Sequence, residues 1–424
     1  MLDNLPYPLG ITVSRADKLE DKILISGNEA AGLGAVYGGA TFCSWYPITP
    51  STSLAEGYEK YAKKFRIENN TGKNLFASVQ AEDELAAIGM AIGANWNGAR
   101  GFTATSGPGI SLMSEFLGLA YFAEIPLVLF NVQRGGPSTG MPTRTQQSDV
   151  LACAYASHGD TKHVVLFPSD PKECFDFSAQ AFDLADQLQT PIFVVSDLDM
   201  GMNDWVCDKF KWDDEYKYNR GKVLNKDDLD EIENFGRYLD VDNDGICYRT
   251  YPGTHPEKGA FFTRGTSHDE YARYTEDGEV NAATLSRLMK KFRTASELVP
   301  EPVIEINGKD SCGVIFYGST SPAVHEAKDI LKEKEINIDL MQIRSFPFNL
   351  DVWEFIANHD RIYVVEQNRD SQMRTLIMAE GGISPEILRP LVHFTGDPIQ
   401  ASYIVNKISE REVNYKSHIN AKKR

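Results

Sequence analysis

Two arginines lie in a loop that is rich in glycine, proline and hydroxyl groups. The loop reads NVQRGGPSTGMPTRTQQSD, residues 131–149, and its first letters belong to the apolar run PLVLFNVQ. Such a run is typical of a buried strand in a parallel sheet, and ligands of α/β sheets bind in the loops at the carboxyl ends of strands. The guanidinium groups of Arg134 and Arg144 suit carboxylate or phosphate groups. The pattern therefore predicts a site for an anionic ligand.

A rigid corner is expected at WYPITPSTS, residues 45–53. Pro47 and Pro50 lack a backbone donor and restrict φ, so the stretch is neither a central strand nor a helix interior. Thr49 lies between them, and the corner would hold its hydroxyl in a fixed place. The hydroxyls of residues 51–53 have a simpler explanation, because Ser and Thr cap the starts of helices.

Three acids, residues 82–84, precede the small-residue segment LAAIGMAIGANWNG. The helix macrodipole favours acids in a first turn, so capping alone would explain them. Glu84, however, begins a stripe that continues with Ile88, Ala91 and Ile92. A carboxylate on this stripe would be costly to bury unless it binds a ligand nitrogen or hydroxyl. Both interpretations stay open from the residues alone.

The segment TATSGPG, residues 103–109, is expected to be a strand that ends in a glycine turn at the start of a helix. Unpaired backbone N–H groups at such a start suit an anion or the polar edge of a ring. An ordinary turn between a strand and a helix explains the same letters, and without further context it is the simpler interpretation.

Two further motifs favour structural explanations. The glycines of GLGAVYGG, residues 32–39, have the wrong spacing for a dinucleotide fingerprint and lie inside an expected helix, so close helix packing explains them better. DVDNDG, residues 240–245, resembles the start of a calcium loop, but the twelfth position is Tyr251 where such a loop needs a bidentate Glu. An acid-rich turn is the preferred interpretation, with a calcium site left open.

The elements that position these residues follow an α/β pattern. Short apolar runs alternate with helical segments, which predicts right-handed βαβ units in a parallel sheet with helices on both faces. A region rich in Asp, Tyr, Lys and Gly then interrupts the pattern before a second α/β pattern begins. The expected division is an N-terminal tether (1–21), a first domain (22–202), an excursion or lid-like segment attached to it (203–295), a linker (296–310) and a second domain (311–424).

The composition excludes several classes of protein. The chain has 424 residues and a formal net charge of −17, which argues against a nucleic-acid binder. No apolar run approaches the ~20 residues that span a bilayer, and the N-terminus has no signal-peptide core. The six cysteines include no CxxC pair, which argues against a zinc or iron–sulfur site held by this chain alone. We therefore expect a cytoplasmic protein without a metal site of its own.

Several motifs together resemble one family. They are SGNEAAGLGAVYGGATFCSWYPITPS, QAEDELAAIGMAIGA, TATSGPGISLMSE, NVQRGGPSTGMPTRTQQSD, DNDGICYRTYPG and VVEQNRDSQM. In this order they are similar to the α subunit of the 2-oxoacid:ferredoxin oxidoreductases, and most similar to the 2-oxoglutarate (2-oxoglutarate synthase) type. The resemblance covers about residues 22–395.

The resemblance implies a thiamine diphosphate enzyme with a pyrimidine-type domain followed by a transketolase C-terminal-like domain. The implied reaction is oxidative decarboxylation of a 2-oxoacid, 2-oxoglutarate above all, with coenzyme A, giving an acyl-CoA, CO2 and reduced ferredoxin. Two alternatives remain: the same chemistry on pyruvate or a branched-chain acid, and a non-catalytic assembly subunit of such a complex.

The resemblance also implies roles for single residues. Glu84 would bond the pyrimidine ring nitrogen as the catalytic carboxyl group, with Glu82 as its competitor. Thr49 and Arg134 would contact the substrate. The candidates for binding a distal substrate carboxylate are Thr143, Arg144 and His158. The candidates for binding the cofactor are Pro47, Ile48, Ser106 and Gly107.

Partner subunits are expected because half of the cofactor site is missing. The family holds Mg2+ and the diphosphate with a GDG motif and a downstream Asn, and the nearest match, NDG at 243–245, lacks that Asn. A β subunit should therefore bring the diphosphate, Mg2+ and a 4Fe-4S cluster. The fused γ domain of many relatives is not found before Ile23, so γ is expected to be a separate subunit, or to have been lost or cut away, and the coenzyme A site stays open.

Overall fold

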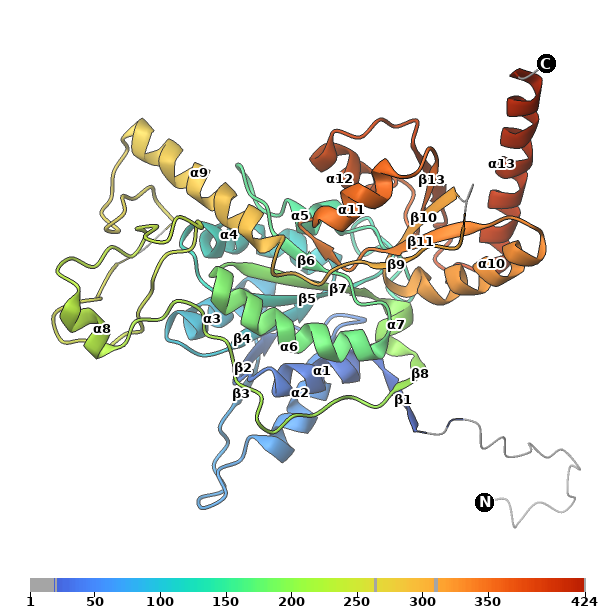
Figure 1. The fold of residues 1–424 in the computed structure, drawn as a ribbon. Helices are drawn as coiled ribbons and strands as arrows, with labels where there is room; N and C mark the ends of the chain where they lie inside the picture. Colours follow the sequence, from blue (N-terminus) through green and yellow to red (C-terminus); the bar gives the residue numbers. More distant parts are fainter. Residues whose placement is uncertain (1–18, 20, 263–264, 309–311, 423–424) are drawn as a thin grey trace, which may run out of the picture.

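A computed structural model describes residues 19, 21–262, 265–308 and 312–422, and it shows two α/β parts beside a long irregular segment (Figure 1). The predicted N-terminal tether, residues 1–21, lies almost entirely outside the described residues. No helix in the described ranges is both long enough and apolar enough to cross a membrane.

The first part is built on a seven-stranded sheet whose neighbours run parallel, except for the antiparallel edge pair β12 and β6. In spatial order its strands are β12 (Ser345–Phe346), β6 (Val164–Leu166), β7 (Pro191–Asp197), β5 (Leu127–Gln133), β4 (Gly101–Thr105), β2 (Phe42–Trp45) and β3 (Ala77–Gln80). Every residue of β4, β5 and β7 is buried, as their continuous apolar runs predict.

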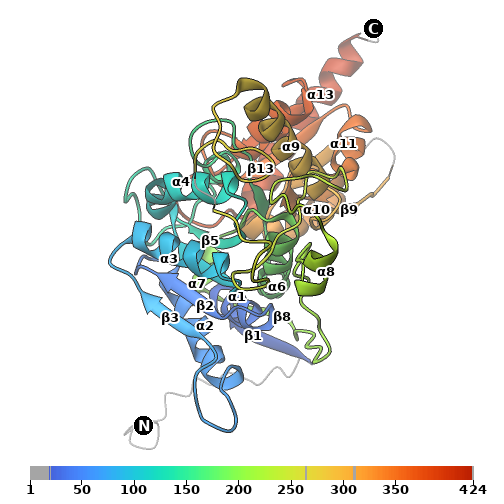
Figure 2. The ribbon, with the colours of Figure 1, turned by 90° about the vertical axis from the view of Figure 1, so that its left-hand side faces the viewer.

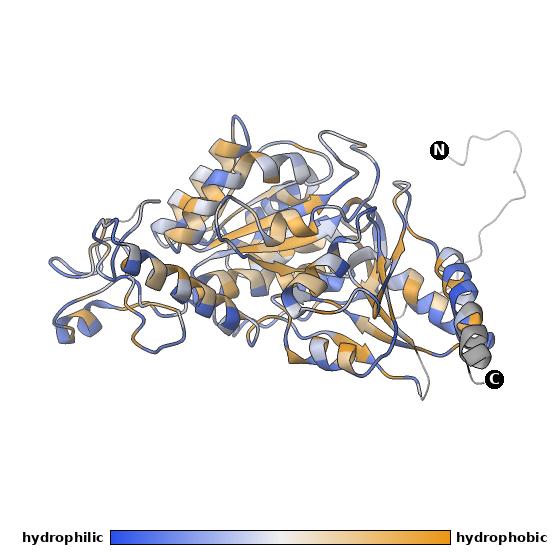
Figure 3. Cartoon of the chain, turned by 90° about the horizontal axis from the view of Figure 1, so that it is seen from above, coloured by the Kyte–Doolittle hydropathy of each residue, from blue (hydrophilic) through white to orange (hydrophobic). Residues whose placement is uncertain are grey.

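Helices cover both faces of this sheet. They are α1 (Gly27–Tyr37), α2 (Thr52–Phe65), α3 (Glu84–Trp96), α4 (Gly107–Phe122), α5 (Val150–Ala154), α6 (Pro171–Leu188) and α7 (Leu198–Met202). Alternate residues of β5 enter two different cores: Val128 and Phe130 pack with α1, α2 and α6, while Leu127 and Leu129 pack with α3, α4 and α5. Figure 3 shows the strands as an apolar layer between these helices. The predicted α/β class is confirmed.

The second part has a five-stranded sheet that is parallel except for its edge strand β9. In spatial order its strands are β14 (Leu388–Val392), β13 (Ile362–Glu366), β10 (Cys312–Phe316), β11 (Ile338–Gln342) and β9 (Val303–Glu305). Its helices are η2 (Gly318–Thr320), α10 (Ser321–Glu333), α11 (Leu350–Ala357), α12 (Gln372–Gly381) and α13 (Ala401–Lys422). The strand β9 falls within the stretch expected to be a linker, so that stretch is partly structured.

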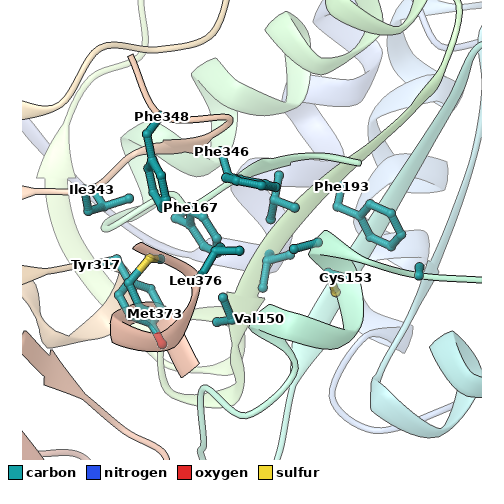
Figure 4. Packing of buried hydrophobic residues seen from close by; sticks show 14 of the residues in the cluster. Val150, Cys153, Phe167, Phe193, Tyr317, Ile343, Phe346, Phe348, Met373 and Leu376 are labelled. Atoms are coloured by element: carbon teal, nitrogen blue, oxygen red, sulfur yellow. The ribbon is translucent and has the colours of Figure 1, made fainter. Parts of the chain in front are cut away.

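One apolar core joins the two parts. The Phe167 ring, next to β6, packs against the Tyr317 ring after β10 with centroids 5.3 Å apart. Figure 4 shows Val150 and Phe167 of the first part among Met373 and Leu376 of the second. The strand β12 also crosses over to extend the first sheet. The domain boundaries expected from the sequence stay a prediction: each part has a core of its own, and the shared core joins the two.

Most of the segment expected to be a lid-like excursion lies at the amino end of the strands, while its first strand lies beside α7 (Figure 1). It contains β8 (Asp204–Asp208), which pairs antiparallel with β1 (Lys22–Ser26), followed by α8 (Lys226–Glu231) and α9 (Gly278–Ala295). Its cations reach acids beside the starts of strands: Arg287 and Lys291 bind Glu124, just before β5. In Figure 1, α8 lies at the left and α7, after the carboxyl end of β7, at the right. The helices α8 and α9 therefore do not cover the carboxyl edge where the candidate ligand loops lie.

The glycines of α1 serve close helix packing, as predicted. A Cβ on Gly32 would lie 2.5 Å from the backbone nitrogen of Tyr58 in α2. A Cβ on Gly34 would overlap the carbonyl oxygen of Phe175 in α6 and lie 2.9 Å from its Cα. Residues 32–39 thus bring three helices together, and no nucleotide is needed to explain them.

The acid-rich turn at 240–245 binds an ammonium group. Lys222 Nζ lies 2.7 Å from a carboxylate oxygen of Asp242, 2.9 Å from Asp244 and 2.9 Å from the Ile246 carbonyl oxygen. Because this lysine already fills the space between the carboxylates, the calcium interpretation is not needed.

We predict that Gly34→Ala destabilises the chain by about 1–3 kcal/mol, because the new methyl group would force α1 away from α6. The matched control is Gly93→Ala in α3, where no atom lies within 4 Å of the new Cβ. The control should be neutral or stabilising by up to about 1 kcal/mol, through helix propensity. Thermal and urea unfolding of both variants measure the difference, and equal midpoints would contradict the packing role of Gly34.

Candidate functional site

Four neighbouring strands bring the candidate residues to one edge of the first sheet. Thr49 follows β2, Glu84 follows β3, Ser106 follows β4 and Arg134 follows β5. Since β3, β2, β4 and β5 are adjacent and parallel, their carboxyl ends lie at the same edge. Residues that are 85 positions apart in the chain therefore become neighbours.

Arg134 is buried beneath the corner that carries Thr49. Its Nη1 donates to the Thr49 carbonyl oxygen at 2.6 Å, and the arginine is 6% exposed. Its Nε is buried and has no hydrogen-bond partner among the described residues. Thr49 itself is exposed. The arrangement leaves an exposed hydroxyl and, beneath it, a buried guanidinium N–H without a partner among the described residues.

The corner is tied down by its own hydroxyls and by an asparagine of α1. Ser51 Oγ donates to the Ile48 carbonyl oxygen at 3.1 Å, and Ser51 makes no side-chain cap to α2, so the capping explanation is wrong for this residue. Asn28 Nδ2 donates to the Pro50 carbonyl oxygen and to Ser53 Oγ, each at 2.8 Å. Asn28 is a supporting residue that sequence reasoning missed, because an Asn inside a glycine-rich helix carries no distinguishing signal.

Glu84 is the first residue of α3 and is buried at the carboxyl edge of the first sheet. It is 7% exposed, whereas Glu82 is exposed and Asp83 accepts a hydrogen bond from the Ala86 backbone nitrogen as the helix cap. A Cβ on Gly109 would lie 2.9 Å from Glu84 Cγ, so the glycine of α4 leaves room for this side chain. No described residue hydrogen-bonds the Glu84 carboxylate. This geometry favours Glu84 over Glu82 as a group that faces a ligand.

The start of α4 adds further unpaired groups. Ser106 precedes α4, and its Oγ is buried with no partner among the described residues. Asp149 lies close by, because a Cβ on Gly107 would be 3.0 Å from its Oδ2. Asn131 Nδ2 donates to Asp149 Oδ2 at 3.1 Å. Burial raises the pKa of Asp149, while the bond from Asn131 and the charge of Arg134 oppose the rise.

Thr143 and Arg144 lie outside this buried group. Both are exposed, and Arg144 Nη1 is 2.8 Å from Asp397 Oδ1 of the second part. They remain on the loop of Arg134, since the Gly135 nitrogen donates to the Arg144 carbonyl oxygen at 2.9 Å. The loop thus presents one buried arginine and one exposed arginine.

His158 lies away from the edge. Its neighbour Ser157 packs against Gly118 of α4, eleven residues after the start of that helix at Gly107. At the rise of an α-helix this corresponds to roughly 16 Å along the axis. His158 is exposed there, so the structure does not bring it to the candidate site.

A buried polar network fixes the far end of the arginine loop to the second part. Gln147 Nε2 donates to the Tyr317 carbonyl oxygen at 3.2 Å, and its Oε1 accepts from the Gln367 backbone nitrogen at 3.1 Å. Ser319 Oγ donates to Asp197 Oδ2 at 2.5 Å. Burial raises the pKa of Asp197 to about 6, and the Ser319 bond opposes the rise. Sequence reasoning missed these residues, because they meet only when the two parts pack together.

Known proteins match most of the chain, including the residues at this edge of the sheet. Residues 33–206 match the family model described as pyruvate flavodoxin/ferredoxin oxidoreductase, thiamine diP-bdg, and this range contains the whole candidate site. The 2-oxoglutarate synthase subunit KorA of Methanothermobacter thermautotrophicus is 32% identical over 386 residues, which are 88% of this chain and 95% of that protein. The chain belongs to the 2-oxoacid:ferredoxin oxidoreductase α-subunit family.

Other members of the family are longer. The 2-oxoacid:ferredoxin oxidoreductase subunit alpha of Saccharolobus solfataricus is 34% identical over 375 residues, which are 86% of this chain but 58% of that protein. The chain thus spans about 60% of the length of such relatives.

Solved structures agree with the fold. The 2-oxoglutarate:ferredoxin oxidoreductase from Magnetococcus marinus, with 2-oxoglutarate, coenzyme A and succinyl-CoA bound, has a TM-score of 0.83 and 30% identity. The match covers 92% of this chain and 65% of that one. A split-gene transketolase, an inactive β4 tetramer, matches 91% of this chain with a TM-score of 0.52 at 11% identity, which shows the fold alone. The expected thiamine diphosphate-type fold with a transketolase-like second part is confirmed.

We predict that Asp197 makes the stability of the chain depend on pH. Its carboxyl group has a higher pKa when folded than when unfolded, so its protonation stabilises the folded state. This stability is complete below about pH 4 and is lost as the pH rises through about 6, a change of about 3 kcal/mol. Asp197→Asn should therefore gain stability relative to the wild type across this window. Urea unfolding of both proteins from pH 4.5 to 8 measures the difference, and a difference that stays flat would contradict the prediction.

Proposed function

We propose that this chain is the catalytic α subunit of a 2-oxoacid:ferredoxin oxidoreductase that acts on 2-oxoglutarate. With coenzyme A, the complex would produce succinyl-CoA, CO2 and reduced ferredoxin. The observation that carries the proposal is the buried Glu84 carboxyl group, without a partner among the described residues, in a range that matches a thiamine diphosphate-binding family. The solved relative from Magnetococcus marinus, with 2-oxoglutarate and coenzyme A bound, supports this choice of substrates.

The groups at the edge fit the aminopyrimidine half of thiamine diphosphate. Such a ring has a nitrogen and an amino group that need buried polar partners. Glu84 offers a carboxyl oxygen, and Ser106 offers a buried hydroxyl next to the start of α4 at Gly107. Pro47 and Ile48, in the corner after β2, would form a wall of the same pocket. When bound, the cofactor supplies a nucleophilic carbon and an electron sink for the loss of CO2.

The chain's own residues then have distinct tasks. Glu84 holds a proton between its carboxyl oxygen and the ring nitrogen. Arg134, through the N–H that has no partner among the described residues, binds the carboxylate of the 2-oxoacid. The hydroxyl of Thr49, fixed by the same corner, donates to the substrate carbonyl. Thr143 and Arg144, at the exposed end of the loop, would bind the distal carboxylate of 2-oxoglutarate.

The surface around the carboxyl edge supports the proposal that a partner subunit binds there. Large apolar side chains are exposed around it: Tyr46 (37%), Leu85 (40%), Leu112 (50%) and Met141 (40%). A group of exposed apolar residues marks an interaction surface. We propose that a β subunit covers it and contributes the diphosphate site, Mg2+ and a 4Fe-4S cluster. A separate γ subunit, ferredoxin as the acceptor and a cytoplasmic location complete the proposal.

We predict that Glu84→Gln lowers the rate of 2-oxoglutarate decarboxylation by about 10²–10⁴-fold, because an amide cannot exchange a proton with the ring nitrogen. The assay is viologen reduction by the reconstituted complex. Glu82→Gln is the matched control, because Glu82 lies two residues earlier and is exposed. An unchanged rate in Glu84→Gln would favour the second candidate function, a non-catalytic assembly subunit.

We predict that Arg144→Met changes substrate preference. If Arg144 binds the distal carboxylate, kcat/KM for 2-oxoglutarate should fall by at least about tenfold, while that for pyruvate changes little. Asp397→Asn is the control, because it removes the present partner of Arg144 and should leave the preference for 2-oxoglutarate intact. Equal losses on both substrates would show that Arg144 only supports the loop.

A further inference from the structure

A small cavity lies at the amino edge of the first sheet, opposite the candidate active site. It has a volume of about 30 Å³ and is formed between the sheet and the 203–295 segment. Trp96, at the end of α3, lines it, whereas Glu84 begins the same helix. Twelve residues separate the two positions, which corresponds to roughly 18 Å along the axis. Figure 2 is viewed from the side on which this segment lies.

Two buried arginines line the cavity and retain unused donors. Arg237 is 3% exposed, and its Nη2 donates to the Glu124 carbonyl oxygen at 2.9 Å. Arg249 is 4% exposed, and its Nη2 donates to Asp186 Oδ1 at 2.7 Å. Three nitrogen atoms have no partner within the described ranges, namely Nε and Nη1 of Arg237 and Nε of Arg249. Buried donors in this state are rare because their desolvation is not compensated.

The faces of both guanidinium groups are occupied by aromatic rings. The Arg237 guanidinium carbon lies 5.5 Å from the Phe261 ring centroid, and that of Arg249 lies 5.3 Å from the Tyr251 centroid. Phe261 and Tyr251 also line the cavity. Because the rings cover the faces, only the edges of the guanidinium groups remain for hydrogen bonds, and edge N–H groups suit an anion.

The surrounding buried charges do not balance. Glu124 is bound by Arg287 at 2.5 Å and by Lys291 at 2.7 Å. A second cluster joins Asp186 to Arg100, Arg220 and Arg249, and Asp183 to Arg100. Together with Arg237, these clusters contain the cations Arg100, Arg220, Arg237, Arg249, Arg287 and Lys291 against the carboxylates Glu124, Asp183 and Asp186.

Arg220 is 29% exposed, and without it the buried surplus is two positive charges when every group is ionised. Burial lowers the pKa of Lys291, yet a neutral lysine would still leave a surplus of one. An uncompensated charge in a protein interior is strongly destabilising. A bound anion removes the surplus and pairs the unused donors in one step.

We propose that this cavity binds one small anion, chloride or a one-carbon carboxylate such as formate or bicarbonate. The volume is enough for an occupant of about one or two water molecules, which favours an anion of this size. The anion bridges Arg237 and Arg249, both of which belong to the 203–295 segment, above the starts of β4 and β5. It thus fastens this segment to the sheet, and the site does not depend on the proposed catalytic function.

Thermal unfolding of the full chain tests the site. Sodium chloride and sodium formate are titrated against sodium gluconate, whose anion is much larger than this volume, at constant ionic strength. An anion that binds only the folded state raises the folding equilibrium constant by the factor 1 + [anion]/Kd. We expect a saturable stabilisation of about tenfold or more at 100 mM chloride or formate and none in gluconate. An equal response to all three salts would overturn the proposal, as would an effect that appears only at molar concentration.

Variants locate the effect. Arg237→Met should abolish the specific stabilisation, because it removes two of the three nitrogen atoms without a partner. Arg220→Met is the matched control: Arg220 pairs with Asp186 at 3.3 Å but does not line the cavity, so the anion effect should persist. Bromide soaked into crystals of the wild type gives a measurement that needs no variant. An anomalous peak within hydrogen-bond distance of Nε of Arg237 and Nε of Arg249 is expected, and water alone in the cavity would overturn the proposal.

Discussion

The carboxyl edge of the first sheet is organised around one buried guanidinium group. Arg134 is 6% exposed, and no carboxylate of the described residues lies within ion-pair distance of it. Asp149 compensates its charge only at longer range. A buried cation in this state requires a close anion to become fully stable. The corner at Thr49 holds the guanidinium from one side, and Asn131 holds Asp149 on the other.

The two edges of the sheet treat buried charge differently. At the amino edge, the carboxylates meet cations directly in ion pairs of 2.5–3.3 Å, although Arg237 has no carboxylate partner among the described residues. At the carboxyl edge, Glu84, Ser106 and Arg134 are buried without such pairing. A protein tolerates this loss of stability where a ligand later restores the missing bonds. The direction of the strands fixes which edge this is, because parallel strands gather their following loops, and the starts of the next helices, at one side.

Local patterns in the sequence predicted the features that arise locally. Continuous apolar runs predicted the buried strands β5 and β7, whereas the stripe that begins at Glu84 left its burial and simple capping equally open. Features that need distant partners could not be predicted in this way. Lys222 neutralises acids that lie twenty residues later in the chain. The strand β12 follows the first strands of the second part in the chain, yet it pairs with β6 of the first sheet. The alternation of apolar and polar residues in the sequence does not predict that pairing.

The loop that carries Arg134 depends on the second part of the chain. Its first residues are anchored to the first sheet, but Thr145 donates to the Gly396 carbonyl oxygen at 3.1 Å, and Gln147 is held by Gln367. The start of the loop is therefore fixed by the first sheet, and its end is fixed by the second part. A shift of the second part would pull on the loop and change the depth at which Arg134 lies under the Thr49 corner. Although the buried candidate residues all come from the first sheet, the position of the arginine is set by the packing of both parts.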